Sequence, residues 1–121
     1  MSALKYKDLS NDLTLVKLNP KDTYSELVDA LDILYNDGSH TNILDLKKFD
    51  TPHLSLDDIK RLSAFTKSLI RSRTRKIKTA IVVSSKSEYF IGHAFSAYTW
   101  GAPIQVGTFS ELKQAIQWLH R

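Results

Sequence analysis

The chain has 121 residues, of which 42% are hydrophobic and 25% charged, and it contains no cysteine. These values are typical of one globular domain spanning residues 1–121, and they exclude a disordered or fibrous protein. The lack of cysteine excludes disulfides, thiol nucleophiles and thiolate metal sites, which suits a cytoplasmic protein. No segment has the pattern of a signal peptide or a membrane-spanning helix, so no integral membrane association is expected.

The net charge of +4 arises in one basic segment. Its five cations, with no acid among them, are Arg71, Arg73, Arg75, Lys76 and Lys78. Without them, twelve basic residues stand against thirteen acidic ones. Such a patch suits phosphates or an acidic partner, but no aromatic residue is interleaved with it, and cations also suit the carboxyl end of a helix. A solvated turn is the favoured interpretation, and nucleic-acid binding is not expected.

The chain begins with a predicted β-hairpin. Residues 4–8 and 13–18 have the composition of strands, and the polar residues 10–12 between them are typical of a turn. Pro20 then ends the second strand.

An amphipathic helix is predicted next. Thr23 and Glu26, three residues apart, match a capping box, and Gly38 is the expected C-cap. Between them, apolar residues recur at the three- and four-residue spacing of a core-facing helix. They are Tyr24, Leu27, Val28, Leu31, Leu34 and Tyr35.

A second buried strand and a second helix follow. Residues 41–46 predict the strand, with Asp45 near its end, and a loop covers residues 50–53. Ser55 and Asp58 match another capping box. The apolar face of this helix is expected to comprise Leu56, Ile59, Leu62, Phe65, Leu69 and Ile70.

The longest apolar run of the chain, residues 80–83, predicts a central strand at residues 78–84 that is buried on both faces. Ser85 and Glu88 match a third capping box, and Gly101 is expected to end the helix that it starts. The residues of this helix expected in the core are Phe90, Ile91, Ala94, Phe95 and Tyr98.

The chain closes with a short strand at residues 104–106 and a helix that Ser110 is expected to cap. This helix would bury Leu112, Ala115, Ile116 and Leu119, with Trp118 at the edge of the stripe. The order β-β-α-β-α-β-α-β-α predicts a single α/β domain with a mixed five-stranded sheet, whose later strands are parallel.

Ligands of such sheets usually bind outside the carboxyl ends of the strands. Three loops would meet there, at residues 45–55, 84–87 and 107–110. Any functional site is therefore expected at this edge.

Four hydroxyl residues near this edge are candidate phosphoacceptors or anion sites, because free N–H groups and the helix dipole favour a phosphate at a helix N-terminus. They are Thr51, Ser55, Ser84 and Ser85. For Ser55 and Ser85, an N-cap worth about 1 kcal/mol is the favoured alternative. No glycine-rich turn supports a phosphate-binding loop.

The third helix and its end contain more aromatic residues than a single buried face of a helix requires. Tyr89 and Trp100 are candidates for lining an apolar pocket or a dimer surface, and the core is the favoured alternative.

No pattern predicts an enzyme. The four histidines show no metal-ligand spacing, and structural roles are favoured for them; they are His40, His53, His93 and His120. Residues 110–113 match Ser-x-x-Lys, but the companion motifs of β-lactamases and a nucleophile elbow are lacking. We therefore expect no catalytic residue, metal or cofactor.

Several segments carry a family resemblance. Residues 78–84 are followed by an Ala- and aromatic-rich helix, then by residues 106–112 and 115–119, and residues 43–46 share the pattern. In these segments, and in its element order, the chain resembles SpoIIAA-like proteins, which are related to the STAS domain of anti-sigma-factor antagonists.

The resemblance implies a non-enzymatic binding or regulatory module with a protein partner or a homodimer. Its alternative implication is a carrier of a small apolar ligand or lipid. STAS switch proteins carry a phosphorylatable Ser or Thr within an Asp-Ser-Ser-Gly pattern, and residues 49–55 of this chain lack that pattern.

Overall fold

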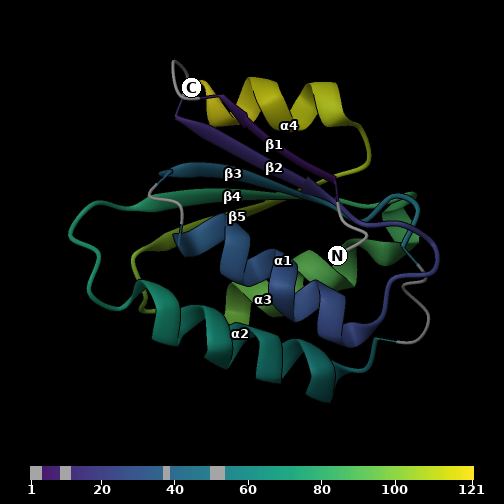
Figure 1. Cartoon of the computed structure of the whole chain (residues 1–121), viewed down its shortest axis with the longest axis horizontal. Helices are drawn as coiled ribbons and strands as arrows, with labels where there is room; N and C mark the ends of the chain where they lie inside the picture. Colours follow the sequence, from purple (N-terminus) through teal and green to yellow (C-terminus); the bar gives the residue numbers. More distant parts are fainter. Residues whose placement is uncertain (1–3, 9–11, 37–38, 50–53) are drawn as a thin grey trace.

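The computed structural model describes residues 4–8, 12–36, 39–49 and 54–121, and for residues 4–8 it describes the backbone alone. These residues form one α/β domain around a single sheet (Figure 1). Its strands, in spatial order, are β1 (Leu4–Asp8), β2 (Leu13–Lys17), β3 (Thr41–Asp45), β4 (Ile77–Val82) and β5 (Ile104–Phe109). Strands β2 to β5 are parallel, and β1 pairs antiparallel with β2. The predicted α/β class and the parallel later strands are confirmed.

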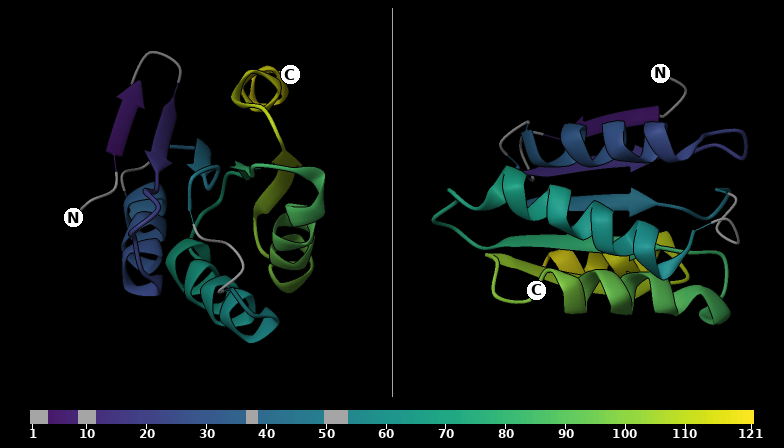
Figure 2. Two further views of the ribbon diagram at one scale, coloured as in Figure 1. Left: turned by 90° about the vertical axis from the view of Figure 1, so that its right-hand side faces the viewer. Right: turned by 90° about the horizontal axis from the view of Figure 1, so that it is seen from below.

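The helices cover both faces of the sheet unequally (Figure 2). One face carries α1 (Tyr24–Asn36), α2 (Leu56–Ile70) and α3 (Tyr89–Tyr98), and the other carries α4 (Leu112–Leu119). Of the three helices on the first face, α2 lies farthest from the sheet (Figures 1 and 2).

The sheet separates two apolar cores. The larger core lies between the sheet and helices α1 to α3, and the smaller lies under α4. The apolar run of β4 serves both, because alternate side chains point to opposite faces. Ile81 and Val83 enter the larger core, whereas Ala80 and Val82 enter the smaller one. The prediction of a strand buried on both faces is confirmed.

Two helices begin where the capping patterns predict. The Ser55 hydroxyl accepts the Asp58 N–H at 3.0 Å, and the Asp58 carboxylate accepts the Ser55 N–H at 3.0 Å. This second bond lowers the pKa of Asp58, since it favours the charged carboxylate. At the start of α1, the Thr23 N–H donates to Glu26 Oε1 at 3.3 Å. Gly38, the expected C-cap of α1, lies outside the described residues.

The other two predicted caps are wrong. A short 3₁₀ turn, Lys86–Glu88, precedes α3, and no side-chain cap bond is found for Ser85 at the start of that turn. Its hydroxyl lies 2.7 Å from the hydroxyl of Ser87 instead. The N-cap of α4 is Glu111 rather than Ser110, again without a side-chain bond. A serine three residues before an acid is therefore not enough to predict the N-cap of an α-helix, as the 3₁₀ turn before α3 shows.

Three residues assigned to the core are exposed. Leu56 is 57% exposed, Phe90 45% and Tyr98 36%. Leu56 stands at the first position of α2, ahead of the packed part of the helix. The buried residues of α3 are Ile91, Gly92 and Phe95, so glycine occupies part of the face on which larger side chains were expected.

Strand β5 is longer than residues 104–106. It continues through Gly107 and Thr108 to Phe109, in register with Ala80 to Val82 of β4. Gly107 lies inside the strand rather than in the loop predicted at residues 107–110, and its lack of a side chain permits close packing. A Cβ there would lie 3.1 Å from the Trp118 ring and 2.9 Å from that of Phe109.

Candidate binding surface

The carboxyl ends of the parallel strands meet at one edge of the sheet. Backbone bonds join them just beyond the strands: Leu46 N–H donates to Val82 O at 2.7 Å, and Val83 N–H donates to Phe109 O at 2.9 Å. The loops after β3 and β4 leave this edge together, as expected. The third expected loop is wrong in its bounds, because residues 107–109 belong to β5.

The serine candidates at this edge face a carboxylate. Ser84 donates to Glu88 Oε1, and the Ser85 hydroxyl lies 3.5 Å from the same oxygen. An anion bound there would meet the negative charge of Glu88, so this turn favours no phosphate. Ser55 is occupied by its capping box, and Thr51 lies outside the described residues.

A pocket of about 360 Å³ opens at the same edge, lined by residues 20–24 and by Phe49, Leu54 and Asp58. In its wall, Asp22 is almost fully buried. The carboxylate accepts the Asn19 N–H at 2.6 Å through Oδ2, whereas Oδ1 has no hydrogen-bond partner among the described residues. Burial raises the pKa of Asp22, and the nearby Glu26 carboxyl raises it further. Among the described residues, no group of three or more His, Cys, Asp or Glu could hold a metal ion.

The two aromatic candidates lie apart. Tyr89 begins α3, and it is half-buried against the larger core with its ring edge toward His93. Trp100 follows the end of α3, and its side chain is not in the core: the residue is 86% exposed. The core alternative therefore holds for Tyr89 and fails for Trp100.

The turn that carries Trp100 is held by several hydrogen bonds. The buried Thr99 hydroxyl donates to Phe95 O at 2.7 Å, Trp100 N–H donates to Ala97 O at 3.3 Å, and Ala102 N–H donates to Thr99 O at 3.0 Å. Gly101 has a φ of +91°, a left-handed conformation that glycine adopts without strain. The hydrogen bonds of this turn therefore hold the backbone of Trp100 in the position that leaves its side chain exposed.

Beside Trp100 lies an open groove of about 550 Å³ between the second half of α2 and this turn. Its walls are Ala64, Lys67, Ser68 and Arg71 on one side, and Trp100, Gly101, Ala102 and Pro103 on the other. We call this feature the Trp100 groove.

Two cations line the Trp100 groove from α2. Lys67 and Arg71 are one helical turn apart, both are exposed, and neither forms an ion pair within the described residues. Because helix α2 returns antiparallel to the strands, its carboxyl end reaches the amino edge of the sheet. The groove therefore lies at the edge opposite the expected one.

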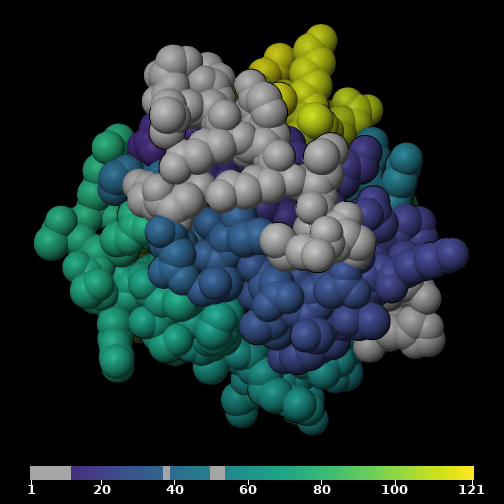
Figure 3. Space-filling model, viewed as in Figure 1, coloured from purple at the N-terminus to yellow at the C-terminus, as the bar shows by residue number. Residues whose placement is uncertain are grey.

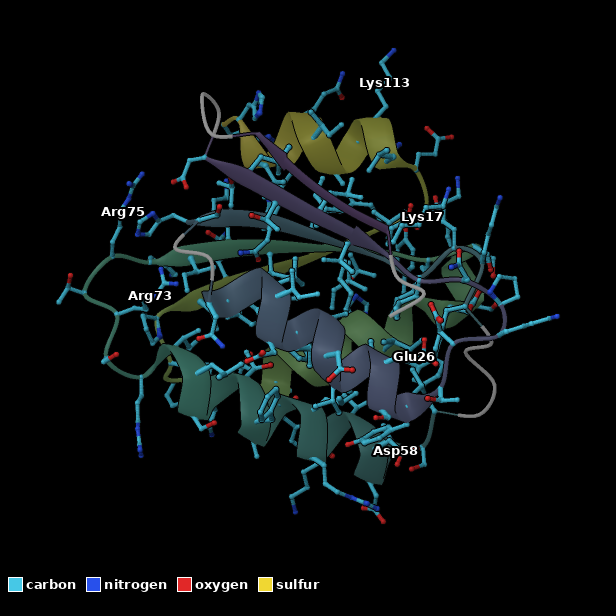
Figure 4. All side chains as sticks on the ribbon, viewed as in Figure 1. Lys17, Glu26, Asp58, Arg73, Arg75 and Lys113 are labelled. Carbon is cyan, nitrogen blue, oxygen red and sulfur yellow. The ribbon has the colours of Figure 1, made fainter. Side chains whose placement is uncertain are left out.

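Much of the basic segment has structural partners. Arg73 lies at the carboxyl end of α1, where Nη2 donates to Tyr35 O at 2.7 Å (Figure 4). Lys78 Nζ donates to Trp118 O at 2.9 Å and lies 4.5 Å from the centroid of the indole. Arg75 Nη1 is 3.9 Å from Asp12 Oδ2. The predicted solvated turn is therefore only part of the description, because Arg73, Arg75 and Lys78 contact other parts of the fold. Of the five cations in this segment, Arg71 lines the groove.

The interior offers little room for a ligand. Between the sheet and the three helices, ten apolar side chains enclose a cavity of only about 20 Å³. Ligand pockets usually measure about 300–1,000 Å³.

Comparisons of the chain with protein-family models, curated proteins and solved structures gave no match. The resemblance to SpoIIAA-like proteins therefore stays a prediction. Within the part of the chain that the structure describes, no helix combines the length and apolarity needed to cross a membrane.

Proposed function

We propose that the chain is a non-enzymatic binding or regulatory module of the SpoIIAA-like, STAS-related type, and that it binds a partner protein at the Trp100 groove. The observation that carries this proposal is the 86% exposure of Trp100 beside two cations, Lys67 and Arg71, that form no ion pair with any described residue.

An exposed tryptophan is unusual, because burying its large ring removes much apolar surface from water and so lowers the free energy strongly. At protein interfaces, tryptophan and arginine are the residues most enriched among those that dominate binding energy. Here both line one groove whose other walls include small or apolar residues, namely Ala64, Ala102 and Pro103. An apolar side chain of a partner fits against these, with acidic groups near Lys67 and Arg71.

The bonded turn supports the same function. An interface residue that is already fixed loses less conformational freedom on binding. The hydrogen bonds of Thr99 and Ala102 fix the backbone that holds Trp100 before any partner arrives. For the alternative function, a carrier of apolar ligands, the cavity enclosed by apolar side chains between the sheet and helices α1 to α3 measures about 20 Å³, far below the size of a usual ligand pocket.

Photocrosslinking tests the proposal. A chain with Trp100→p-benzoylphenylalanine, expressed in its own cells and irradiated, is expected to give a discrete protein adduct. The matched control carries the same group at Phe90, an exposed aromatic residue at the other end of α3. A protein adduct at position 100 that is absent at position 90 supports the proposal. No protein adduct at position 100, or equal adducts at both positions, contradicts it.

A further inference from the structure

Neighbouring helices α1 and α2 carry opposite charges. Helix α1 contains three acidic residues and no basic one; the acids are Glu26, Asp29 and Asp32. Beyond its capping turn, α2 carries only basic charges, and these are Lys60, Arg61 and Lys67, followed by Arg71 at the C-cap.

These charges are available for a partner. Asp29, Asp32, Lys60, Lys67 and Arg71 are all exposed. The two helices pack side by side within one layer, and their surfaces adjoin on one face of the molecule (Figure 3). Even so, none of the five forms an ion pair within the described residues. Although Asp32 accepts a hydrogen bond from Asn36, the opposite charges of the two helices are therefore not paired with each other among the residues that the structure describes.

One series of exposed positions on each helix follows the same spacing. On α1 the exposed positions are Ser25, Asp29, Asp32 and Asn36. On α2 one series of exposed positions comprises Lys60, Ala64, Lys67 and, at the C-cap, Arg71; Leu56, Asp57, Arg61 and Ser68 are exposed beside it. Both series advance by four, three and four residues, which keeps them on one side of a helix over roughly 16 Å. Each helix thus presents a straight stripe of equal length; the acidic stripe on α1 carries two acids, and the basic stripe on α2 carries three cations.

We infer that the partner at the Trp100 groove is a second copy of this chain, whose α1 lies along α2. A two-fold axis parallel to the helices places α1 of each copy against α2 of the other, since both helices run in the same direction. Such an interface pairs the acidic stripe with the basic stripe twice. The greater distance of α2 from the sheet lets it fit beside the recessed α1 of the other copy (Figure 2).

The inference rests on the proposed function, because Ala64, Lys67 and Arg71 belong both to the basic stripe and to the groove. Trp100, at the edge of the same stripe, supplies apolar area that the charged helices lack. Charge complementarity makes this association dependent on salt.

Sedimentation velocity with two charge-reversed variants tests the dimer. The first variant carries Asp29→Lys and Asp32→Lys, and the second carries Lys67→Glu and Arg71→Glu. Each variant alone is expected to be monomeric, with a dimer dissociation constant raised about tenfold or more. An equal mixture of the two is expected to restore dimers, because both α1–α2 contacts of the mixed pair then join opposite charges: the reversed α1 meets the reversed α2, and the unchanged α1 meets the unchanged α2. Circular dichroism melting of each variant checks that it is folded.

Salt gives a second readout for the wild-type chain. Raising NaCl from about 20 mM to about 500 mM shortens the Debye length from about 20 Å to about 4 Å and is expected to dissociate the dimer. A wild-type chain that is monomeric at low salt overturns the inference. Dimers that persist in both variants, or a mixture that stays monomeric, also overturn it. If a photoadduct at position 100 contains a different protein while the chain stays monomeric, the dimer is wrong and the proposed function stands.

Discussion

Gly92 of α3 lies directly against Thr108 of β5, so closely that no side chain fits between them. A Cβ built on Gly92 would stand 1.7 Å from Thr108 Oγ1 and 2.8 Å from Thr108 Cβ. The lack of a side chain at Gly92 therefore lets α3 pack closely on β5.

Replacing Gly92 by Ala is expected to destabilise the fold. In an unobstructed helix the same change stabilises by about 1 kcal/mol. Here the clash with Thr108 reverses the sign, and overpacking of this kind typically costs about 1–3 kcal/mol. Urea unfolding measures the difference in the free energy of unfolding.

A double variant separates the clash from helix propensity. Thr108→Ala removes the Oγ1 and Cγ2 atoms and leaves only the Cβ, so Gly92→Ala should cost less in that background. Ser96→Ala, at an exposed position one turn further along α3, serves as the control and should change stability little. An equal cost of Gly92→Ala in both backgrounds would show that Thr108 is not the obstacle.

A buried chain of hydrogen bonds ties α1 to β3 and β4. The Tyr35 hydroxyl lies 2.8 Å from Thr79 Oγ1, which donates to Asn42 Oδ1 at 2.5 Å. Tyr35→Phe removes one bond and is expected to cost about 1 kcal/mol. Asn42→Ala removes the acceptor of the Thr79 O–H and the donor to Leu34 O at 3.5 Å, and it leaves a void, so it should cost more, about 2–3 kcal/mol. Chemical unfolding of both variants checks this order.

The same tyrosine predicts a loss of stability in base. Burial raises the pKa of Tyr35 above its ordinary value and outweighs the hydrogen bond with Thr79, which lowers it. Above about pH 10, the unfolded chain ionises this tyrosine while the folded chain keeps it protonated. The free energy of unfolding should then fall by about 1.4 kcal/mol per pH unit from this residue alone.

Tyr35→Phe isolates that contribution. The difference in stability between the wild-type chain and this variant should be constant below about pH 10 and should shrink above it. A difference that stays constant into stronger base contradicts the raised pKa of Tyr35.

Asp22→Asn is expected to stabilise the chain at neutral pH. Burial, and then Glu26, raise the pKa of Asp22 in the folded state, so its contribution to stability is present in acid and is lost as pH rises. Asparagine carries no charge, can still accept the Asn19 N–H, and can donate to Glu26. The gain in melting temperature should therefore be larger at pH 7 than at pH 4. Equal gains at both pH values would contradict this explanation.

Local patterns predicted the parts of the fold that local forces decide. The apolar run at residues 80–83 identified the central strand because a strand buried on both faces needs no alternation. Ser55 and Asp58 identified the start of α2 because both halves of a capping box depend only on neighbouring residues. The parallel order followed from the alternation of strands and helices.

The remaining features depend on tertiary contacts. The length of β5 depends on the fit of Gly107 between two aromatic rings, which composition does not reveal. The exposure of Phe90 and Tyr98 follows from which side of α3 approaches β5, and the Gly92–Thr108 contact decides that. The residue type alone makes Trp100 a candidate for an interface. The groove beside it could not be predicted, because its two walls, α2 and a turn some 30 residues later, come together only in the folded chain.

One measurement decides whether proteins dock beside Trp100. The yield of the photoadduct at position 100 is compared between the otherwise wild-type chain and a chain that also carries Lys67→Glu and Arg71→Glu. We predict an adduct of about twice the mass of the 13.8 kDa chain, largely lost after charge reversal. An adduct of undiminished yield in the reversed chain, or no protein adduct in either, would contradict binding at this groove.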